Sequence, residues 1–514
     1  MKFKDQTLYA LAKSKRRSSE SVKAEQSHPS TWKPPCIRSL KESEDIQAIA
    51  FFFNNVVLPG RGKESTKGLF ETILPLYTRC DQESPLSHSI LATAVLILAV
   101  GRGECADALV PSKYFDVALA SLQIALRSQS QNKQNEILMA TLLLQLREGF
   151  VAISQSREVS SVHHSGTVSL VKHRGRRNYE DEASKYLLLG VLHNEINSAI
   201  RHGYQVDADL VAKCCRKSMP LNSSFELDKL GVGVAELQAR YEVIKTQEPA
   251  CLSGQCIRQR DLTAIHDQAS ALEKDLQIWA RSVPSHWLPF RLNDVKSSIS
   301  AYGNFCEIYP TIEIASIWNA WRRYRLIILK VMIACDIGAL TCNVCPNTIP
   351  PARESERERT KEMVRECISA VSHSVPFFLG NRQDPYDHFF VPSDLEFPSY
   401  RCLSEQDLAS LPFSRQCSVL TREEHSRHVL AQGAWHILSH LGHVLVILMD
   451  TVGQSMKSYL DSEQIHWIEG QLIRAAFLFR PGPNMSLSDP IWAEDGRVQH
   501  ISFRMLAQRH ACLV

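Results

Sequence analysis

Hydrophobic residues recur at the spacing of an α-helix along most of the chain, and this period constrains the fold more than any other feature. Apolar side chains three and four residues apart line one face of a helix, whereas a half-buried strand alternates with a period of two. No run of alternating strands occurs in the 514 residues. The segments with a helical period are residues 68–79, 86–102, 112–129, 133–154, 160–174, 183–203, 226–245, 260–282, 304–337, 354–372, 420–450 and 462–480. The chain is therefore expected to be all-α, a large multi-helix domain with helical hairpins around a continuous core.

Local signals mark where several of these helices begin and end. A helical stripe from Ile46 to Val56 is followed by Leu58-Pro59-Gly60, which stops a helix. Ser84-Pro85 and Asp181-Glu182 predict helix starts, because Ser and Asp side chains accept hydrogen bonds from amides of the first turn. Ordered structure is expected to begin near residue 43.

The segment from His163 to Gly175 predicts a helix with a defined end. Its last turn holds Lys172, His173 and Arg174, whose positive charge suits the carboxyl end of a helix dipole. Gly175 can adopt the left-handed conformation that ends a helix. The stripe expected to pack on a neighbouring helix consists of Val162, Gly166, Ser169, Leu170 and His173.

Composition divides the chain into a basic tail and a slightly acidic body. Residues 1–43 are rich in Ser, Lys and Pro and are expected to be disordered. Residues 1–41 hold ten Lys or Arg and three Asp or Glu, a net charge of +7, so the other residues carry about −4 of the chain's total of +3. The ordered domain is expected to span residues 44–514, with loops near 342–353 and 380–415.

The tail contains a basic cluster of the kind that nuclear import receptors read or that phosphate attracts. The cluster consists of Lys13, Lys15, Arg16 and Arg17. A solvated tail is the alternative interpretation. Because the body is slightly acidic, affinity for nucleic acid is expected only at the N-terminus.

Neither secretion nor a membrane span is predicted. The opening Met1-Lys2-Phe3-Lys4-Asp5 is followed by no sustained apolar run of the secretory type. The longest apolar stretch, Ile90 to Val100, has about half of the roughly 20 residues that a membrane helix needs. The 15 cysteines are scattered through apolar helical patterns, which is typical of reduced thiols in an intracellular protein. No membrane partner is expected.

The motifs of the common enzyme classes are missing from the sequence. The stretch Gly60 to Glu64 comes nearest to a phosphate-binding loop but lacks its first Gly and its final hydroxyl. No Gly-x-Ser-x-Gly and no His-Glu-x-x-His occurs. Cys342 and Cys345 supply two of the four ligands of a structural zinc site, so thiols at a loop end are the preferred interpretation. The chain is not expected to be an enzyme.

One group of histidines has the spacing of metal ligands. His436, His440 and His443 lie at i, i+4 and i+7, with His425 and His428 upstream. Imidazoles at i and i+4 can share a divalent ion. The surrounding helix is strongly apolar and offers no nearby carboxylate to orient the rings. Histidines at the rim of a buried helix are therefore preferred, and a metal-dependent helical enzyme is the weaker alternative.

A second helical face combines indole rings with guanidinium groups. Trp318, Trp321, Arg322 and Arg325 lie at i, i+3, i+4 and i+7. Indole rings bury large apolar areas, and Arg stems can lie along them with a cation–π contact. The pattern is typical of a packed core, and the lining of an effector pocket is the alternative.

A series of short motifs follows a recognisable order between residues 46 and 480. They are Phe51 to Pro59, Ser84 to Leu86, His163 to Gly175, Leu272 to Trp287, Ala315 to Leu326, Ser374 to Gly380 and Trp467 to Gln471. The series resembles the fungal-specific regulatory (middle homology) domain of zinc-binuclear-cluster, or Zn(II)2Cys6, transcription factors. The resemblance implies a nuclear regulator of transcription. Its implied partners are related factors in homo- or heterodimers, co-regulators or the transcription machinery, and a small-molecule effector.

The chain departs from this family in its first residues. The family's DNA-binding module holds two zinc ions with six closely spaced cysteines, whereas the first 79 residues here contain only Cys36. The resemblance therefore implies no zinc cofactor in this chain, and DNA binding that is weak or depends on a partner. Lys13 to Arg17 resembles the linker that follows the cluster in the family, so a missing upstream segment is one explanation. Loss of the module and action through partners are the others.

These expectations leave a main function and an alternative. The main one is the regulatory and effector-responsive domain of a transcription factor. The alternative is a partner-binding modulator or dimerising inhibitor without its own DNA contact. An exposed apolar face near residues 160–175 or 304–337 would favour this alternative.

Overall fold

The chain divides into two units, residues 1–43 and residues 44–514. The first unit, including the basic cluster, lies outside the described residues except for its last residue. The computed structural model describes residues 43–58, 70–102, 113–128, 134–154, 160–174, 179–220, 222–246, 251–252, 255–340, 354–383, 395–403 and 420–479. All the helices and strands that it describes belong to the second unit.

The prediction of an all-α fold is confirmed, because helices make up almost all of the secondary structure in the described residues. The first half contains two α-helices that flank a short π-helix, followed by six more α-helices. These are α2 (Glu44–Phe52), η1 (Phe53–Val57, π), α3 (Phe70–Tyr77), α4 (Pro85–Gly101), α6 (Lys113–Ser128), α7 (Gln134–Ser154), α8 (Val162–His173), α9 (Glu182–His202) and α10 (Ala208–Cys214).

The second half contains longer helices, two small hairpins and a second π-helix. The α-helices are α11 (Ser223–Thr246), α12 (Ile257–Ser282), α13 (Ile312–Leu340), α14 (Glu354–Leu379), α17 (Arg422–His428), α18 (Ala434–Ile447), α19 (Thr451–Lys457) and α20 (Ser462–Phe479). The other elements are β1 (Cys251–Leu252), β2 (Gln255–Cys256), η4 (Ser285–Trp287, 3-10), β3 (Phe290–Asn293), β4 (Phe305–Ile308), η5 (Tyr400–Cys402, 3-10) and η6 (Val429–Gly433, π).

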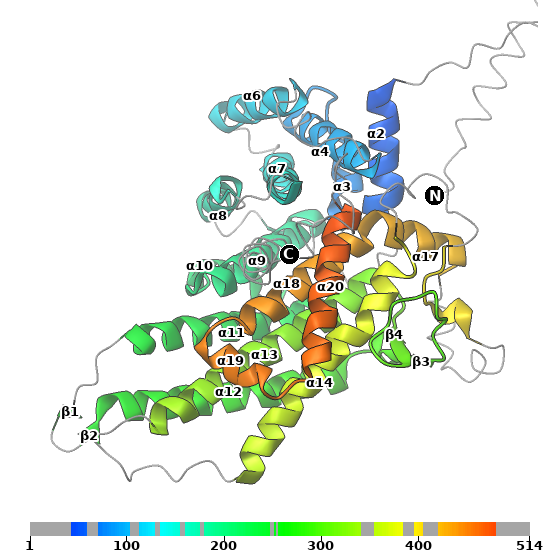
Figure 1. The fold of residues 1–514 in the computed structure, drawn as a ribbon. Coiled ribbons are helices and arrows are strands. Elements are labelled where there is room, and N and C mark those ends of the chain that lie inside the picture. Colours follow the sequence, from blue (N-terminus) through cyan, green and yellow to red (C-terminus); the bar gives the residue numbers. More distant parts are fainter. Residues whose placement is uncertain are drawn as a thin grey trace, which may run out of the picture. The chain divides into compact units, whose positions relative to one another are not determined.

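Helix α13 is the centre of the second half. It packs against α11, α12, α14 and α18 (Figure 1). In the first half, α4 packs against α2, α6 and α7. One large cluster of buried residues runs from Ala48 to Leu478, and a smaller one fills the space between α4, α6 and α7. The continuous core that the periodicity predicts is therefore present, with α13 inside it.

Both predicted helix starts are correct in detail. Ser84 precedes α4 and accepts a hydrogen bond from the Ser87 amide at 3.1 Å. Asp181 precedes α9 and accepts one from the Ser184 amide at 2.9 Å. These caps satisfy amides that no preceding helical turn can reach.

The predicted helix over residues 304–337 is wrong in its first turns. Residues Phe305–Ile308 form strand β4, which pairs antiparallel with β3. The side chains of β4 alternate between half-buried and buried, and Pro310 favours an extended residue before it. Helix α13 begins only after this proline, where the Thr311 hydroxyl accepts a hydrogen bond from the Ile314 amide at 3.2 Å.

The apolar stripe predicted for α8 is only partly correct: Leu170 packs against the core, but Val162, Ser169 and His173 are exposed. Val162 is 71% exposed, whereas Thr167 and Val171 are buried. A Cβ added to Gly166 would meet Thr141 only at 4.0 Å, an ordinary contact, so no close approach depends on that glycine. The face is set instead by His164, whose Nε2 lies 2.7 Å from the Glu195 carboxylate of α9. The basic last turn is present, and Gly175 lies outside the described residues.

The described parts of the predicted loop at 380–415 are held on the end of α14. Gly380 has a φ of +51°, and a Cβ there would lie 2.1 Å from the Glu396 carbonyl oxygen. Asn381 accepts a hydrogen bond from the Glu396 amide at 2.8 Å, and its own amide donates to the Glu396 carbonyl at 3.1 Å. Only glycine fits this left-handed position against a neighbouring backbone.

Helix lengths differ from the prediction mainly at Pro376. This residue lies in the last turn of α14, which continues to Leu379 instead of ending near residue 372.

Among the described residues, none of the helices taken singly is long and apolar enough to cross a membrane. The bent pair Arg422–Ile447 and Thr451–Lys457 reaches that threshold together, by length and composition alone.

Candidate functional site

The candidate site is the buried polar set carried by helix α13. Long buried helices are usually apolar throughout, but α13 buries polar side chains in successive turns. They are Ser316, Asn319, Arg322, Arg323 and Arg325, each less than 5% exposed. Charged groups this deep need partners, because desolvation of an unpaired charge costs several kcal/mol. The partners come from two opposite sides of the helix.

Indole rings form the first side. Trp318 Nε1 donates to the Trp287 carbonyl of η4 at 2.7 Å, and Trp321 Nε1 donates to the Leu276 carbonyl of α12 at 2.9 Å. The Trp318 ring packs edge-on against Trp279 and Trp321, with centroids 5.5 Å and 5.3 Å apart. Buried indoles contribute large apolar area and still need an acceptor for the N–H. The rings therefore join α12, η4 and α13.

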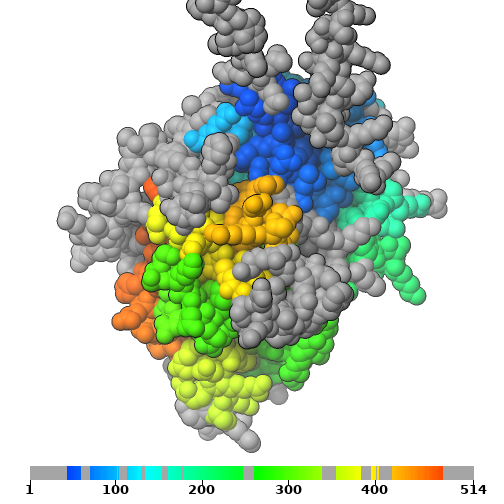
Figure 2. Space-filling view, turned by 90° about the vertical axis from the view of Figure 1, so that its right-hand side faces the viewer, coloured from blue at the N-terminus to red at the C-terminus, as the bar shows by residue number. Residues whose placement is uncertain are grey.

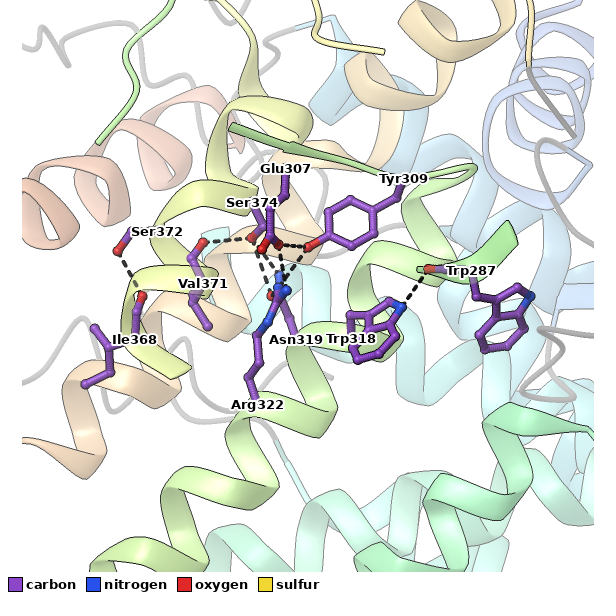
Figure 3. Close-up of polar contacts among 10 residues, drawn as sticks. All are labelled: Trp287, Glu307, Tyr309, Trp318, Asn319, Arg322, Ile368, Val371, Ser372 and Ser374. Carbon is purple, nitrogen blue, oxygen red and sulfur yellow. Dashed lines mark hydrogen bonds and ion pairs between the residues drawn. The ribbon is translucent and has the colours of Figure 1, made fainter. Parts of the chain in front are cut away.

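Arg322 occupies the centre of a hydrogen-bonded cluster on this side (Figure 3). One guanidinium nitrogen donates to the Tyr309 hydroxyl at 2.8 Å and to Asn319 Oδ1 at 2.7 Å. The other donates to Glu307 Oε2 at 2.6 Å. Burial lowers the pKa of Arg322, but Glu307 and Tyr309 outweigh this effect and the pKa is raised. Arg322 is therefore a permanent buried cation, paired with the carboxylate of β4.

The same cluster reaches α14 through Asn319. Its Nδ2 donates to the Ser374 hydroxyl at 3.0 Å, and that hydroxyl donates to the Val371 carbonyl at 2.7 Å (Figure 3). The carbonyl of Ile368 likewise accepts from the Ser372 hydroxyl at 3.0 Å. Strand β4, helix α13 and helix α14 are thus tied by one network in which donors and acceptors alternate.

Arg325 shows the predicted contact between an Arg stem and an indole. Its guanidinium lies 4.7 Å from the centroid of the Trp321 ring. Its Nε also donates to Glu273 Oε1 of α12 at 2.8 Å, and both side chains are nearly buried. Burial lowers the pKa of Arg325, but the neighbouring Cys367 and Glu273 have the larger combined effect, so the pKa is raised. Of the four residues of the predicted face, Trp318, Arg322 and Arg325 are buried, and Trp321 is half-buried and packed against the core.

The histidines of α18 form the second side, and they do not converge on one point. His436 Nδ1 and His440 Nε2 both lie within hydrogen-bonding distance of the Ser316 hydroxyl, at 3.2 Å and 2.9 Å. His443 instead lies 3.3 Å from a guanidinium nitrogen of Arg323. No group of three or more metal-ligand residues occurs among the described residues. A guanidinium that donates to His443 also competes with a cation for the same lone pair.

A hydrogen-bond chain continues from Arg323 to the opposite end of the core. Arg323 donates to Asn197 Oδ1 at 2.5 Å. Asn197 Nδ2 lies 3.1 Å from His193 Nε2, and His193 Nδ1 lies 2.8 Å from Asp228 Oδ1. A guanidinium can only donate, so Asn197 Oδ1 is the acceptor and Asn197 Nδ2 is the donor to His193 Nε2. The other ring nitrogen of a neutral His193, Nδ1, then carries the hydrogen and donates it to the Asp228 carboxylate. This hydrogen-bond chain therefore has the Arg323 cation at one end and the Asp228 carboxylate at the other, and it connects α13, α9 and α11.

The tautomer of His443 follows from the same logic. Its Nε2 accepts from Arg323, and its Nδ1–H donates to the Ser439 carbonyl at 2.8 Å. Burial and the nearby Arg323 cation hold the pKa of His443 well below its usual value. His443 is thus a neutral acceptor at physiological pH.

Sequence reasoning missed most partners of these arginines. Glu307, Glu273, His193, Asn197 and Asp228 are polar residues, largely buried, on elements with apolar faces. A polar residue in register with an apolar stripe is a signal that could have found those on helices, because buried polar groups need partners. The predicted basic residues Lys13, Lys15, Arg16 and Arg17, and the pair Cys342 and Cys345, lie outside the described residues.

The zinc ions of the family that the sequence resembles do not fit the described part of the chain. The cysteines of this part whose side chains are described and free are Cys80, Cys214, Cys215, Cys306, Cys335, Cys367 and Cys402. They form no ligand group of three or more with one another or with neighbouring residues of this part. Comparisons with known proteins found no family model, no curated protein and no solved structure that matches this chain.

Proposed function

We propose that this chain is the regulatory part of a transcription regulator and works in the nucleus. One observation supports the proposal most. Three of the segments that carry the sequence resemblance, residues 272–287, 315–326 and 374–380, lie far apart in sequence but meet around α13. Trp318 contacts Trp279 and the Trp287 carbonyl, and Asn319 donates to Ser374. A shared buried centre is a physical reason for those motifs to occur together.

The proposed mode of action needs no catalytic group. The helical body would restrain or release activation through a co-regulator, a related factor or a small-molecule effector. DNA binding by the chain alone would be weak, would ignore sequence and would depend on the basic tail. No metal ion or other cofactor takes part in this proposal.

Tethering the full chain to DNA tests the regulatory role. We expect a fusion to an unrelated sequence-specific DNA-binding domain to raise or lower reporter transcription several-fold in a fungal host. The same DNA-binding domain alone is the baseline. A Lys245→Met fusion should behave like the wild type, because this lysine is exposed on α11. An unchanged reporter at equal protein level would contradict the proposal.

The basic tail is tested separately with four charge-removing substitutions. Changing Lys13, Lys15, Arg16 and Arg17 to Ala should move a fluorescent fusion of the full chain out of the nucleus. In binding assays, the salt dependence of weak DNA binding should fall by about 0.9 for each phosphate that the tail no longer neutralises. The matched control changes four exposed lysines of the body. They are Lys172, Lys245, Lys274 and Lys296. Equal effects of both sets would contradict a specific role for the tail.

The alternative function, a partner-binding modulator, is favoured by one observation. Val162 at the start of α8 is 71% exposed, and Ile124 on α6 is 68% exposed. Val162 adjoins a contact between the two helices, because the ring of the next residue, His163, lies 6.4 Å from that of Phe115 at the start of α6. Native mass spectrometry combined with the tethered reporter distinguishes this function: a stable dimer or a captured related factor, without any change of the reporter by the chain itself, is expected only for the modulator.

A further inference from the structure

The two π-helices η1 and η6 contact each other although they lie near opposite ends of the described chain. Figure 2 shows the dark blue surface of α2 and η1 lying directly against the gold and orange surface of the segment around α17. A π-turn widens the helix by one residue, interrupts the regular ladder of i to i+4 hydrogen bonds and is often found at functional sites. In η1, the Leu58 amide accordingly donates to the Phe53 carbonyl, five residues back, at 2.9 Å.

One side chain of η6 donates hydrogen bonds to the backbone of η1. Gln432 is 1% exposed, and its Nε2 donates to the Asn55 carbonyl at 3.0 Å and to the Val56 carbonyl at 3.2 Å. Carbonyl groups buried without a donor cost free energy. A single amide from a distant helix therefore supplies hydrogen bonds to two successive carbonyls of η1.

The π-turn of η6 has a fixed position that aims Gln432 at η1. A Cβ on Gly433 would lie 2.1 Å from the Phe378 carbonyl oxygen, so η6 rests directly on the last turn of α14. Conversion of η6 to a regular α-helix would shift the register by one residue, which is a rotation of about 100°. Gln432 would then point away from η1. The contact therefore depends on the π form of η6.

The rest of α2 and η1 packs on α4 and on the first turns of α6. Asp45 accepts from the Tyr114 hydroxyl at 2.7 Å, and Gln47 accepts from Arg102 at 3.0 Å. The buried side chains Phe52, Phe53 and Val56 pack into the body. A helix of nine residues is too short to be stable by itself. Residues 44–57 therefore keep their structure only while docked, and they form a natural unit of local opening.

We propose that η1, η6 and Gln432 form a latch that holds residues 44–57 on the helical body, and that this segment releases as one unit while the body stays folded. Residue 44 directly follows the basic tail in sequence. An open latch adds fourteen residues to the reach of that tail, about 45–50 Å when extended. This use of the latch as a regulatory output rests on the proposed function, but the latch itself does not.

Hydrogen exchange on the unmodified full chain tests the opening directly. We expect amides of residues 44–57 to exchange through an opening with a weaker denaturant dependence than amides of α13, because release of fourteen residues exposes less surface than global unfolding does. The same free energy and the same denaturant dependence for both segments would overturn the proposal, since residues 44–57 would then open only by global unfolding. Neither result depends on transcriptional activity.

A matched pair of variants tests the role of Gln432. Gln464 of α20 is also buried, at 4% exposure, and its Nε2 donates to Ser369 and Ser372 hydroxyls of α14. Gln432→Leu should speed exchange of residues 44–57 by about tenfold or more and leave α13 nearly unchanged. Gln464→Leu should not speed exchange of residues 44–57. Equal effects of both variants on this segment, or no effect of Gln432→Leu, would overturn the latch.

Discussion

Replacing Arg322 with Met is expected to lower the free energy of unfolding by about 3–5 kcal/mol. The reason is the partner that remains. Glu307 would keep its charge in a site where its side chain is 17% exposed, without the guanidinium that now lies 2.6 Å away. Asn319 and Tyr309 would also lose their shared donor. Removing one member of a buried pair costs more than removing both.

Urea unfolding followed by tryptophan fluorescence measures this loss. Lys245→Met is the control, because Lys245 and Glu242 form an exposed pair that should contribute about 0–1 kcal/mol. The double variant Arg322→Met, Glu307→Leu should recover part of the loss, since it leaves no buried charge unpaired. A loss below about 1 kcal/mol for Arg322→Met would show that the cluster contributes little.

The folded state is expected to lose about 3 kcal/mol of stability between pH 6.5 and 4.5 from the buried His425, and the buried His443 acts in the same direction. Burial, together with the neighbouring His428, lowers the pKa of His425 to about 3. Burial and Arg323 hold the pKa of His443 well below its usual value. Below pH 6.5 the unfolded chain binds protons at these rings and the folded chain does not. The stability that depends on His425 is therefore complete above pH 6.5 and falls by about 1.36 kcal/mol per pH unit below it, and His443 changes stability in the same direction.

His425→Gln isolates one of the two contributions. Gln does not titrate, and its amide can donate to the Pro398 carbonyl that His425 Nε2 now contacts at 3.1 Å. Unfolding measured across this pH range should show about 3 kcal/mol less loss in the variant than in the wild type. His466→Gln on α20 is the control, because this ring is exposed. An identical pH profile for His425→Gln and wild type would contradict the assignment.

Local signals in the sequence predicted most of the fold, and nonlocal contacts explain the errors. The caps at Ser84 and Asp181 involve residues within three positions, so their spacing was sufficient. Strand β4 has four residues, and an apolar run that short fits a strand or a helix equally well. The face of α8 depends on Glu195, which is 31 positions from its partner His164. The π-turns depend on contacts between distant helices and leave no periodic signal.

In the candidate site, too, the sequence predicted what depends on local spacing and missed what depends on nonlocal contacts. Trp318, Trp321, Arg322 and Arg325 share a helical face by spacing alone, so the sequence was enough to group them. Their acidic partners were not predictable, because Glu273 is separated by 52 positions from Arg325 and comes from another helix. The three histidines share a face by spacing as well. Their different partners, Ser316 and Arg323, follow from how α18 crosses α13.

The sequence distance that the latch spans sets the order of events during synthesis. Asn55 and Gln432 are 377 positions apart, so at about 5–20 residues per second the ribosome needs about 20–75 s to deliver the second after the first. For Arg323 and His443, which are 120 positions apart, the same delay is about 6–24 s. Throughout the longer interval, the nascent chain carries an N-terminal helix whose last partner has not been made. The carbonyl groups of Asn55 and Val56 then lack the amide of Gln432, and a ribosome that stalls before codon 432 leaves a product without this contact.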